Sequence, residues 1–74
     1  MRRDKIAIYR DVLKACMEGE RKTRISYKAG IEFRRLNSIL EKLIDAGLIE
    51  VQSGSVIYKI TEEGKIFLKI LEKL

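Results

Sequence analysis

The segment from Gly30 to Gly47, GIEFRRLNSILEKLIDAG, constrains the fold of this chain more than any other stretch. Its apolar residues recur every three to four positions, which is the spacing of one face of an α-helix. Polar residues occupy the opposite side. Gly47 ends the pattern, because glycine adopts the left-handed conformation that closes many helices without a Cβ penalty. We therefore predict a helix over residues 32–46, with a buried face formed by Leu36, Ile39, Leu40, Leu43 and Ile44.

Length and charge limit the kind of protein that can contain such a helix. The 74 residues are enough for one domain, residues 1–74, whose core would bury only about 60% of the unfolded surface. Sixteen Lys and Arg residues against eleven Asp and Glu residues give a net charge of +5, which favours nucleic acid as a partner over a membrane surface. No apolar run approaches the ~18 residues of a membrane-spanning helix, and residues 1–5 do not resemble a signal segment. We expect a cytoplasmic protein with no membrane partner.

The residue types that support catalysis or metal binding are scarce in this chain. It has no histidine and one cysteine, which excludes an internal disulfide and leaves no credible zinc site. Its five glycines are scattered rather than gathered in a phosphate-binding loop. Cys16 falls on an apolar helix face with no histidine to activate it, so we expect it to be a small core residue. The sequence predicts a protein that is not an enzyme and uses no cofactor and no metal.

A first helix is expected over residues 4–18, where apolar residues follow helical spacing. Ile8 falls almost opposite the predicted buried face. We interpret Ile8 as an ordinary exposed apolar residue, and the alternative is a contact with a second chain. The predicted buried face consists of Ile6, Tyr9, Leu13, Cys16 and Met17, with Val12 at its edge.

A second, shorter helix is expected to end at Ala29, just before Gly30. Thr23 is its predicted N-cap, since Thr accepts a hydrogen bond from the free N–H groups of a helix start. Ile25 and Ala29 would then face inward, and Arg24 and Lys28 would lie together on the outer side. Two helices joined by a short turn that contains glycine are typical of a helix-turn-helix.

Two strands are expected after Gly47, because residues 48–52 and 56–60 are rich in β-branched and aromatic residues. Residues 53–55, Ser-Gly-Ser, form a loop of hairpin length. In the second strand, alternate residues would share one face, namely Val56, Tyr58 and Ile60.

The last helix, residues 62–74, carries more apolar surface than a one-sided helix needs. Thr61 is its expected N-cap, and Glu62 and Glu63 in its first turn oppose the positive end of the helix dipole. Its apolar residues spread over roughly 200°, whereas one buried face needs about 100°. We interpret the surplus as the seam of a homodimer, and the alternative is a helix sunk into a groove of its own domain. The predicted interface residues are Ile66, Phe67, Ile70, Leu71 and Leu74.

The expected order of elements, ααα-ββ-α, is mainly helical with a small β-hairpin, as in a winged helix. The sequence also resembles the small archaeal winged-helix DNA-binding proteins, a family of predicted transcriptional regulators. The resemblance lies in KTRISYKAG at 22–30, AGLIE at 46–50 and YKITEEG at 58–64. The first block is fairly specific, whereas the other two recur across many winged helices. The chain departs from the family where the third helix begins, with Glu32 and Phe33 in place of a Ser or Thr cap and a Tyr.

The resemblance implies binding of double-stranded DNA, with helix 32–46 inserted into the major groove. Arginine can pair with guanine and asparagine with adenine, so the base-reading candidates are Arg34, Arg35, Asn37 and Ser38. The candidates for contact with phosphates are Arg24, Tyr27, Lys28 and Lys42, with Arg21 and Lys22 beside them and Arg2 and Arg3 in a basic N-terminal arm.

We expect a sequence-specific transcriptional regulator that acts as a homodimer. One alternative is a non-specific architectural protein of chromatin, which would share the fold but show little sequence preference. A second alternative is a winged-helix module that docks on another protein.

Overall fold

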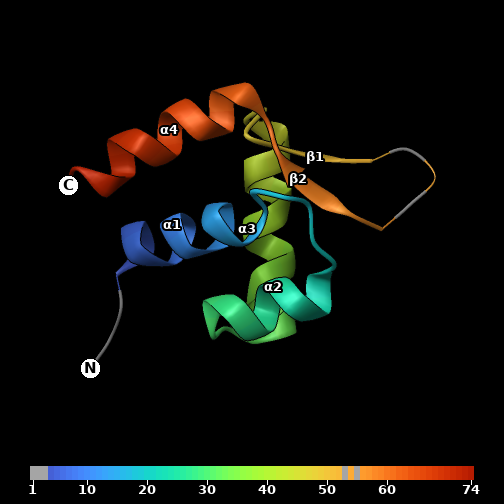
Figure 1. Cartoon of the computed structure of the whole chain (residues 1–74). Helices are drawn as coiled ribbons and strands as arrows, with labels where there is room; N and C mark the ends of the chain where they lie inside the picture. Colours follow the sequence, from blue (N-terminus) through green and yellow to red (C-terminus); the bar gives the residue numbers. More distant parts are fainter. Residues whose placement is uncertain (1–3, 53, 55) are drawn as a thin grey trace.

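Three helices, a two-stranded hairpin and a fourth helix follow one another in the predicted order (Figure 1). The computed structural model describes residues 4–52, 54 and 56–74. The elements are α1 (Lys5–Ala15), α2 (Lys22–Ala29), α3 (Phe33–Asp45), β1 (Ile49–Val51), β2 (Tyr58–Ile60) and α4 (Glu62–Glu72). This order confirms the mainly helical ααα-ββ-α fold with a small hairpin as the wing.

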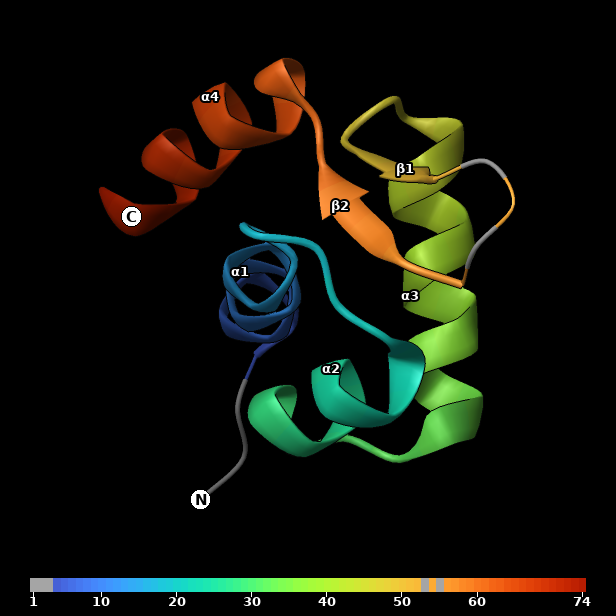
Figure 2. The ribbon, with the colours of Figure 1, turned by 45° about the vertical axis from the view of Figure 1, so that its right-hand side comes forward.

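The central helix, α1, buries a face that overlaps only partly with the predicted one. Ile8 is only 2% exposed and belongs to the core with Val12 and Ala15, whereas Ile6 and Met17 are exposed. The interpretation of Ile8 as an exposed residue is therefore wrong. The reason is that α1 lies between α2 and α4 and contacts both helices (Figures 1 and 2). The sides of α1 that face α2 and α4 are therefore the ones excluded from water. The residues of α1 and the following turn that are buried as predicted are Leu13 and Cys16.

The start of α2 also differs from the prediction. The helix begins at Lys22 with Arg21 in the N-cap position, and Thr23 lies inside its first turn. A contact with a distant part of the chain sets this start. The Glu20 N–H donates to the Tyr58 carbonyl at 2.9 Å, and the Tyr58 N–H donates to the Glu20 carbonyl at 2.8 Å. Glu20 is thereby held against β2, and the helix begins directly after it. Ile25 and Ala29 are buried, as predicted.

The hairpin is shorter than the two predicted strands. Its antiparallel register pairs Ile49 with Ile60, Glu50 with Lys59 and Val51 with Tyr58. Ile49 and Ile60 are buried, but Val56 is exposed, because the hairpin extends away from the body of the molecule (Figure 1). Of the three residues predicted to share one face of the second strand, Ile60 is buried, Tyr58 is half-buried and Val56 is exposed. Residues 53 and 55 of the predicted loop lie outside the described residues.

The end of α3 and the start of α4 are held close together by hydrogen bonds and close packing. The Thr61 hydroxyl accepts from the Gly64 N–H at 3.0 Å, which confirms the predicted N-cap, and donates to the Gly47 carbonyl at 2.7 Å. The Thr61 N–H donates to the Leu48 carbonyl at 3.0 Å. Gly64 is buried against that same carbonyl, and a Cβ placed on Gly64 would lie 2.2 Å from the Leu48 oxygen. A side chain at position 64 would therefore force α4 or the backbone at Leu48 to shift.

The last helix, α4, uses only part of its apolar surface inside the domain. Leu68 and Leu71 are each 5% exposed in the core, and Phe67 is half-buried against it. Leu71 therefore serves the core of its own domain and does not lie on the exposed face where we predicted it. The apolar residues that remain exposed here are Ile66 at 63% and Ile70 at 52% on α4, and Leu74 at 75% just beyond its end.

Candidate nucleic-acid interface

The predicted base-reading residues form one exposed surface on the first half of α3. Arg34, Arg35, Asn37 and Ser38 are all exposed. On the opposite face of the helix, four side chains are buried in the core and hold α3 rigidly, namely Leu36, Ile39, Leu40 and Leu43. Figure 2 shows α3 at one side of the molecule, with α2 at its N-terminal end. This placement leaves the polar side of the first half of α3 at the surface.

Charge changes sign along the exposed side of α3. Arg34 and Arg35 lie in the first turn, whereas Glu41 and Asp45 are exposed in the second half of the helix. A carboxylate near a phosphate is repelled by it, so the first half of α3 is the part that suits a polyanion. Lys42 is exposed among these acidic residues, as the one predicted phosphate contact in the second half of α3.

The predicted phosphate contacts of α2 fall into two groups. Tyr27 is 85% exposed and points outward. Lys28 instead lies on the α1 side of α2, where it lines a depression with Asp11, Lys14 and Ala15. Its ammonium donates to the Glu20 carboxylate at 2.7 Å. This hydrogen bond holds the pKa of the Glu20 carboxyl below its usual value.

Arg24 is exposed one helical turn before Lys28, on the same side of α2. Arg24 and Lys28 are therefore grouped together as predicted, but Lys28 already has an anionic partner within the domain.

A groove lies between the start of α2 and the hairpin, and it includes Tyr58, which the sequence analysis did not propose as a site residue. Arg21, Lys22, Thr23, Val56 and Tyr58 line this groove, which has a volume of about 290 Å³. The Lys22 ammonium lies 5.9 Å from the centre of the Tyr58 ring, within the range of a cation–π contact. Alternation along the second strand predicts only that Tyr58 shares a face with Val56 and Ile60. The backbone pairing with Glu20, which no local pattern announces, brings Tyr58 beside the start of α2.

Two of the predicted phosphate contacts belong to the N-terminal segment. Arg2 and Arg3, the proposed basic arm, lie outside the described residues.

Cys16 is fully buried, as expected of a core residue. Burial raises the pKa of its thiol to about 12, and the nearby Glu20 carboxylate acts in the same direction. The thiol is therefore protonated at neutral pH and is a poor nucleophile or metal ligand. Across the described residues, no cluster of three or more His, Cys, Asp or Glu side chains could hold a metal ion. Within the same part of the chain, no helix is both long and apolar enough to cross a membrane.

Three helices followed by an antiparallel wing, with a third helix that is buried on one face and exposed on the other, define a class of protein. The chain belongs to the winged helix-turn-helix family, whose sequence profile matches residues 2–74. Among solved structures, it is similar to Sso10a-2, a DNA-binding protein from Sulfolobus solfataricus. The two share 31% sequence identity with a TM-score of 0.88, over 96% of this chain and 77% of that chain. No curated protein sequence matches the chain significantly. The resemblance to small archaeal winged-helix DNA-binding proteins is thus confirmed.

Proposed function

We propose that this protein is a sequence-specific transcriptional regulator that binds double-stranded DNA with the first half of α3 in the major groove. The observation that carries the proposal is the exposed surface of Arg34, Arg35, Asn37 and Ser38 on a helix anchored in the core by its other face. Arginine and asparagine have the donor geometry that distinguishes guanine and adenine. The similarity to a protein described as DNA-binding supports the same proposal.

The backbone of the DNA would be held by residues at both ends of α2. Tyr27 is exposed in the last turn of α2, and Arg21 and Lys22 line the groove between the start of α2 and the hairpin. Contacts of this kind fix orientation and add affinity without reading sequence. The protein would act by binding alone, without catalysis, cofactor or metal. It would bind DNA in the cytoplasm.

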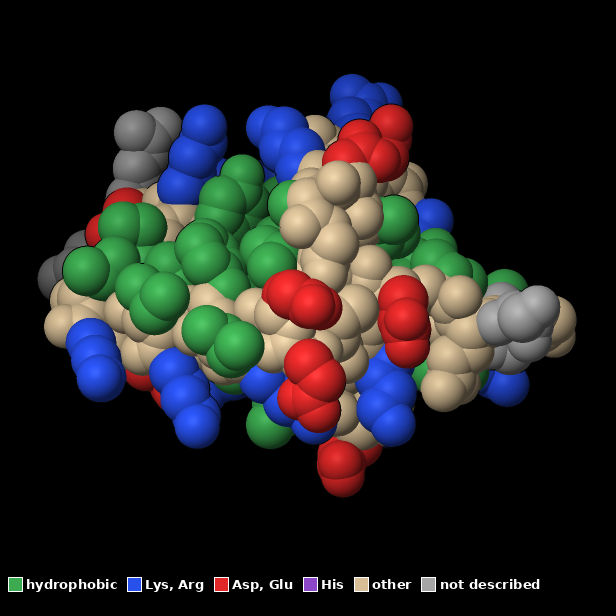
Figure 3. All heavy atoms as spheres, turned by 90° about the horizontal axis from the view of Figure 1, so that it is seen from above, with side chains coloured by type: hydrophobic (Ala, Val, Ile, Leu, Met, Phe, Trp, Pro, Cys, Tyr) green, Lys and Arg blue, Asp and Glu red, His purple; other side chains and the backbone are tan. Residues whose placement is uncertain are grey.

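We further propose that the protein works as a homodimer joined through α4. Ile66, Ile70 and Leu74 are exposed and recur every four residues along the end of the chain, and a contiguous exposed apolar surface is a mark of protein–protein contact. Figure 3 shows hydrophobic side chains gathered over the side of the molecule that carries α4, with basic side chains along their edge. α4 and α3 lie on different sides of the molecule (Figure 2), so pairing through α4 leaves α3 free to reach DNA.

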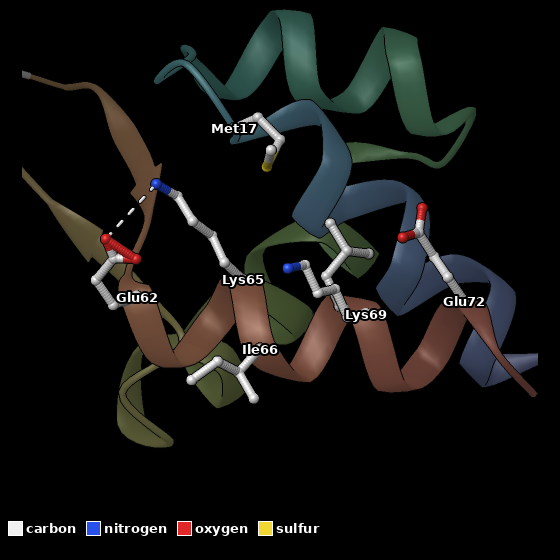
Figure 4. Close-up of a pocket in the computed structure, with 7 residues that line it drawn as sticks. Met17, Glu62, Lys65, Ile66, Lys69 and Glu72 are labelled. Carbon is white, nitrogen blue, oxygen red and sulfur yellow. Dashed lines mark ion pairs between the residues drawn. The ribbon is translucent and has the colours of Figure 1, made fainter.

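The surface beside α4 is also hollowed. A cavity of about 280 Å³ is lined by Met17 of the turn after α1 and by residues of α4. Figure 4 shows that charged side chains flank it: Lys65 with its ion-pair partner Glu62 at 3.8 Å, and Lys69 and Glu72 further along the helix. Apolar residues with a charged rim are the usual composition of a protein–protein interface.

Ile70→Glu is expected to convert the dimer to a monomer, because a carboxylate in the middle of an apolar seam would be buried without a partner. Light scattering during size-exclusion chromatography measures the mass. Val51→Glu is the matched control, since Val51 is also exposed, at 44%, but lies on the hairpin. A wild-type mass of one chain, or a mass that Ile70→Glu leaves unchanged, would contradict the dimer.

The test of DNA binding is a titration of duplex DNA at several salt concentrations, with random-sequence DNA and with a pool enriched by the protein itself. A specific regulator should prefer a selected site by a hundredfold or more, toward the range of specific recognition. Equal affinity for both pools with a steep salt dependence would identify an architectural protein instead. Absence of binding at low salt would exclude both and favour a protein-docking module.

A further inference from the structure

Phe33 is the first residue of α3 and is left 46% exposed. Its side chain lies outside the core cluster that the described residues form, although Ile31, two positions earlier, packs against that cluster. Among the described residues, Phe33 is the one large hydrophobic residue of α3 that is left exposed; the others lie on α1 and the turn after it, α2, the hairpin and the C-terminal segment. An exposed phenyl ring beside Arg34 is therefore out of place on a surface otherwise suited to a polyanion, unless the ligand itself offers apolar surface there.

DNA offers such surface at one position in the major groove. The C5-methyl group of thymine is the apolar feature of the groove floor, and aromatic or aliphatic side chains contact it. The N-terminal residues of a recognition helix are the ones that reach base edges, and Phe33 is the first of them. Both the position of Phe33 and its apolar side chain therefore suit contact with a thymine methyl group.

Asn37 follows Phe33 by one helical turn on the same flank of α3 and is exposed. Side chains four residues apart on a helix are neighbours, with Cβ atoms about 5–6 Å apart. Asparagine can donate to N7 and accept from N6 of adenine, the base paired with thymine. The pair Phe33 and Asn37 therefore matches three of the four groups that an A·T pair displays in the major groove: the thymine methyl group and the N7 and N6 positions of adenine.

We propose that Phe33 and Asn37 together read an A·T base pair, with Phe33 packed on the thymine methyl group and Asn37 hydrogen-bonded to adenine. This inference rests on the proposed DNA binding and specifies its base preference. Arg34 and Arg35 complement the pair, since their geometry suits guanine. The preferred site would then contain A·T and G·C pairs side by side.

The test compares one enriched duplex prepared with thymine and with uracil, which lacks only the C5-methyl group. Wild-type protein should bind the thymine duplex more tightly by about fourfold for each methyl contacted, which corresponds to burial of one methyl group. Phe33→Ala should bind both duplexes equally, with the thermal unfolding temperature of the wild type. Val51→Ala, which removes a comparably exposed apolar side chain from the hairpin, should retain the preference.

Asn37 is tested with 7-deazaadenine, which removes the N7 acceptor. This base should weaken binding of the wild type but not of Asn37→Ala, while Asn37→Ala keeps its preference for thymine over uracil. Equal binding of both duplexes by the wild type, or a thymine preference that survives Phe33→Ala, would overturn the inference and leave DNA binding intact. Failure of the wild type to bind either duplex at low salt would instead overturn the proposed function, and this inference with it.

Discussion

Arg34→Ala and Arg35→Ala should each weaken binding to a preferred DNA site by about 1–3 kcal/mol, or roughly 5- to 150-fold. Both side chains are exposed in the first turn of α3, and a guanidinium that pairs bidentately with guanine contributes energy of this size. The measurement is the dissociation constant for the enriched site and for random-sequence DNA at one fixed salt concentration. The loss should be larger on the enriched site, because random DNA rarely offers the matching base.

Arg24→Ala is the matched control for these two variants. It also removes one exposed guanidinium, but from α2, where we expect contact with phosphate. Its loss should be similar on all sequences and should reduce the slope of log affinity against log salt concentration by about one. If Arg34→Ala and Arg35→Ala behaved as Arg24→Ala does, then the two residues of α3 would bind phosphates, and the specificity of this protein would have to come from elsewhere.

Gly64→Ala should destabilise the fold by about 1–3 kcal/mol or more, although the same change within a helix ordinarily stabilises by about 0.5–1 kcal/mol. The new Cβ would lie 2.2 Å from the Leu48 carbonyl oxygen and 2.6 Å from Cγ1 of Ile60. Relief of this clash must separate α4 from the end of α3, and the Thr61 N–H would lose its bond to the same carbonyl. Urea unfolding at one protein concentration measures the change as a lower midpoint.

Glu63→Ala is the control for Gly64→Ala, because it introduces alanine at the adjacent, exposed position. It should change the stability only by the loss of one carboxylate near the start of α4, about 0.3–1 kcal/mol. A Gly64→Ala protein as stable as the wild type would mean that the start of α4 can move away from Leu48 at little expense. The close approach at this junction would then not be what holds α4 in place.

The elements with a single buried face were predictable from the sequence. α3 buries Leu36, Ile39, Leu40 and Leu43, as its spacing indicates, because only one side of this helix meets the core. Thr61 caps α4, as expected, since a cap depends on residues three positions apart. The exposure of the candidate DNA-contacting residues on α3 was also predictable, because they occupy the positions of the helix that do not belong to its apolar face.

The predictions that were wrong concern residues whose burial or helix start depends on contact with an element distant in the sequence. The burial of Ile8 was missed because α1 contacts α2 and α4 at once, and a helix pattern does not reveal how many neighbours the helix has. Thr23 was predicted to start α2 from its local preference, yet the pairing of Glu20 with Tyr58 moves the start to Lys22. Leu71 was assigned to an interface because the apolar arc of α4 does not show which part of it faces α1.

The sequence by itself therefore determined the order of the elements, the winged-helix class and the exposed basic start of α3. These features depend on periodicity, capping and charge, which act over a few neighbouring residues. Only the tertiary structure decided that Lys28 is paired with Glu20, that Tyr58 lies beside Lys22, and that Gly64 fits against the Leu48 carbonyl. Each of these contacts joins different elements, and their geometry arises only when the helices and the hairpin pack into one core.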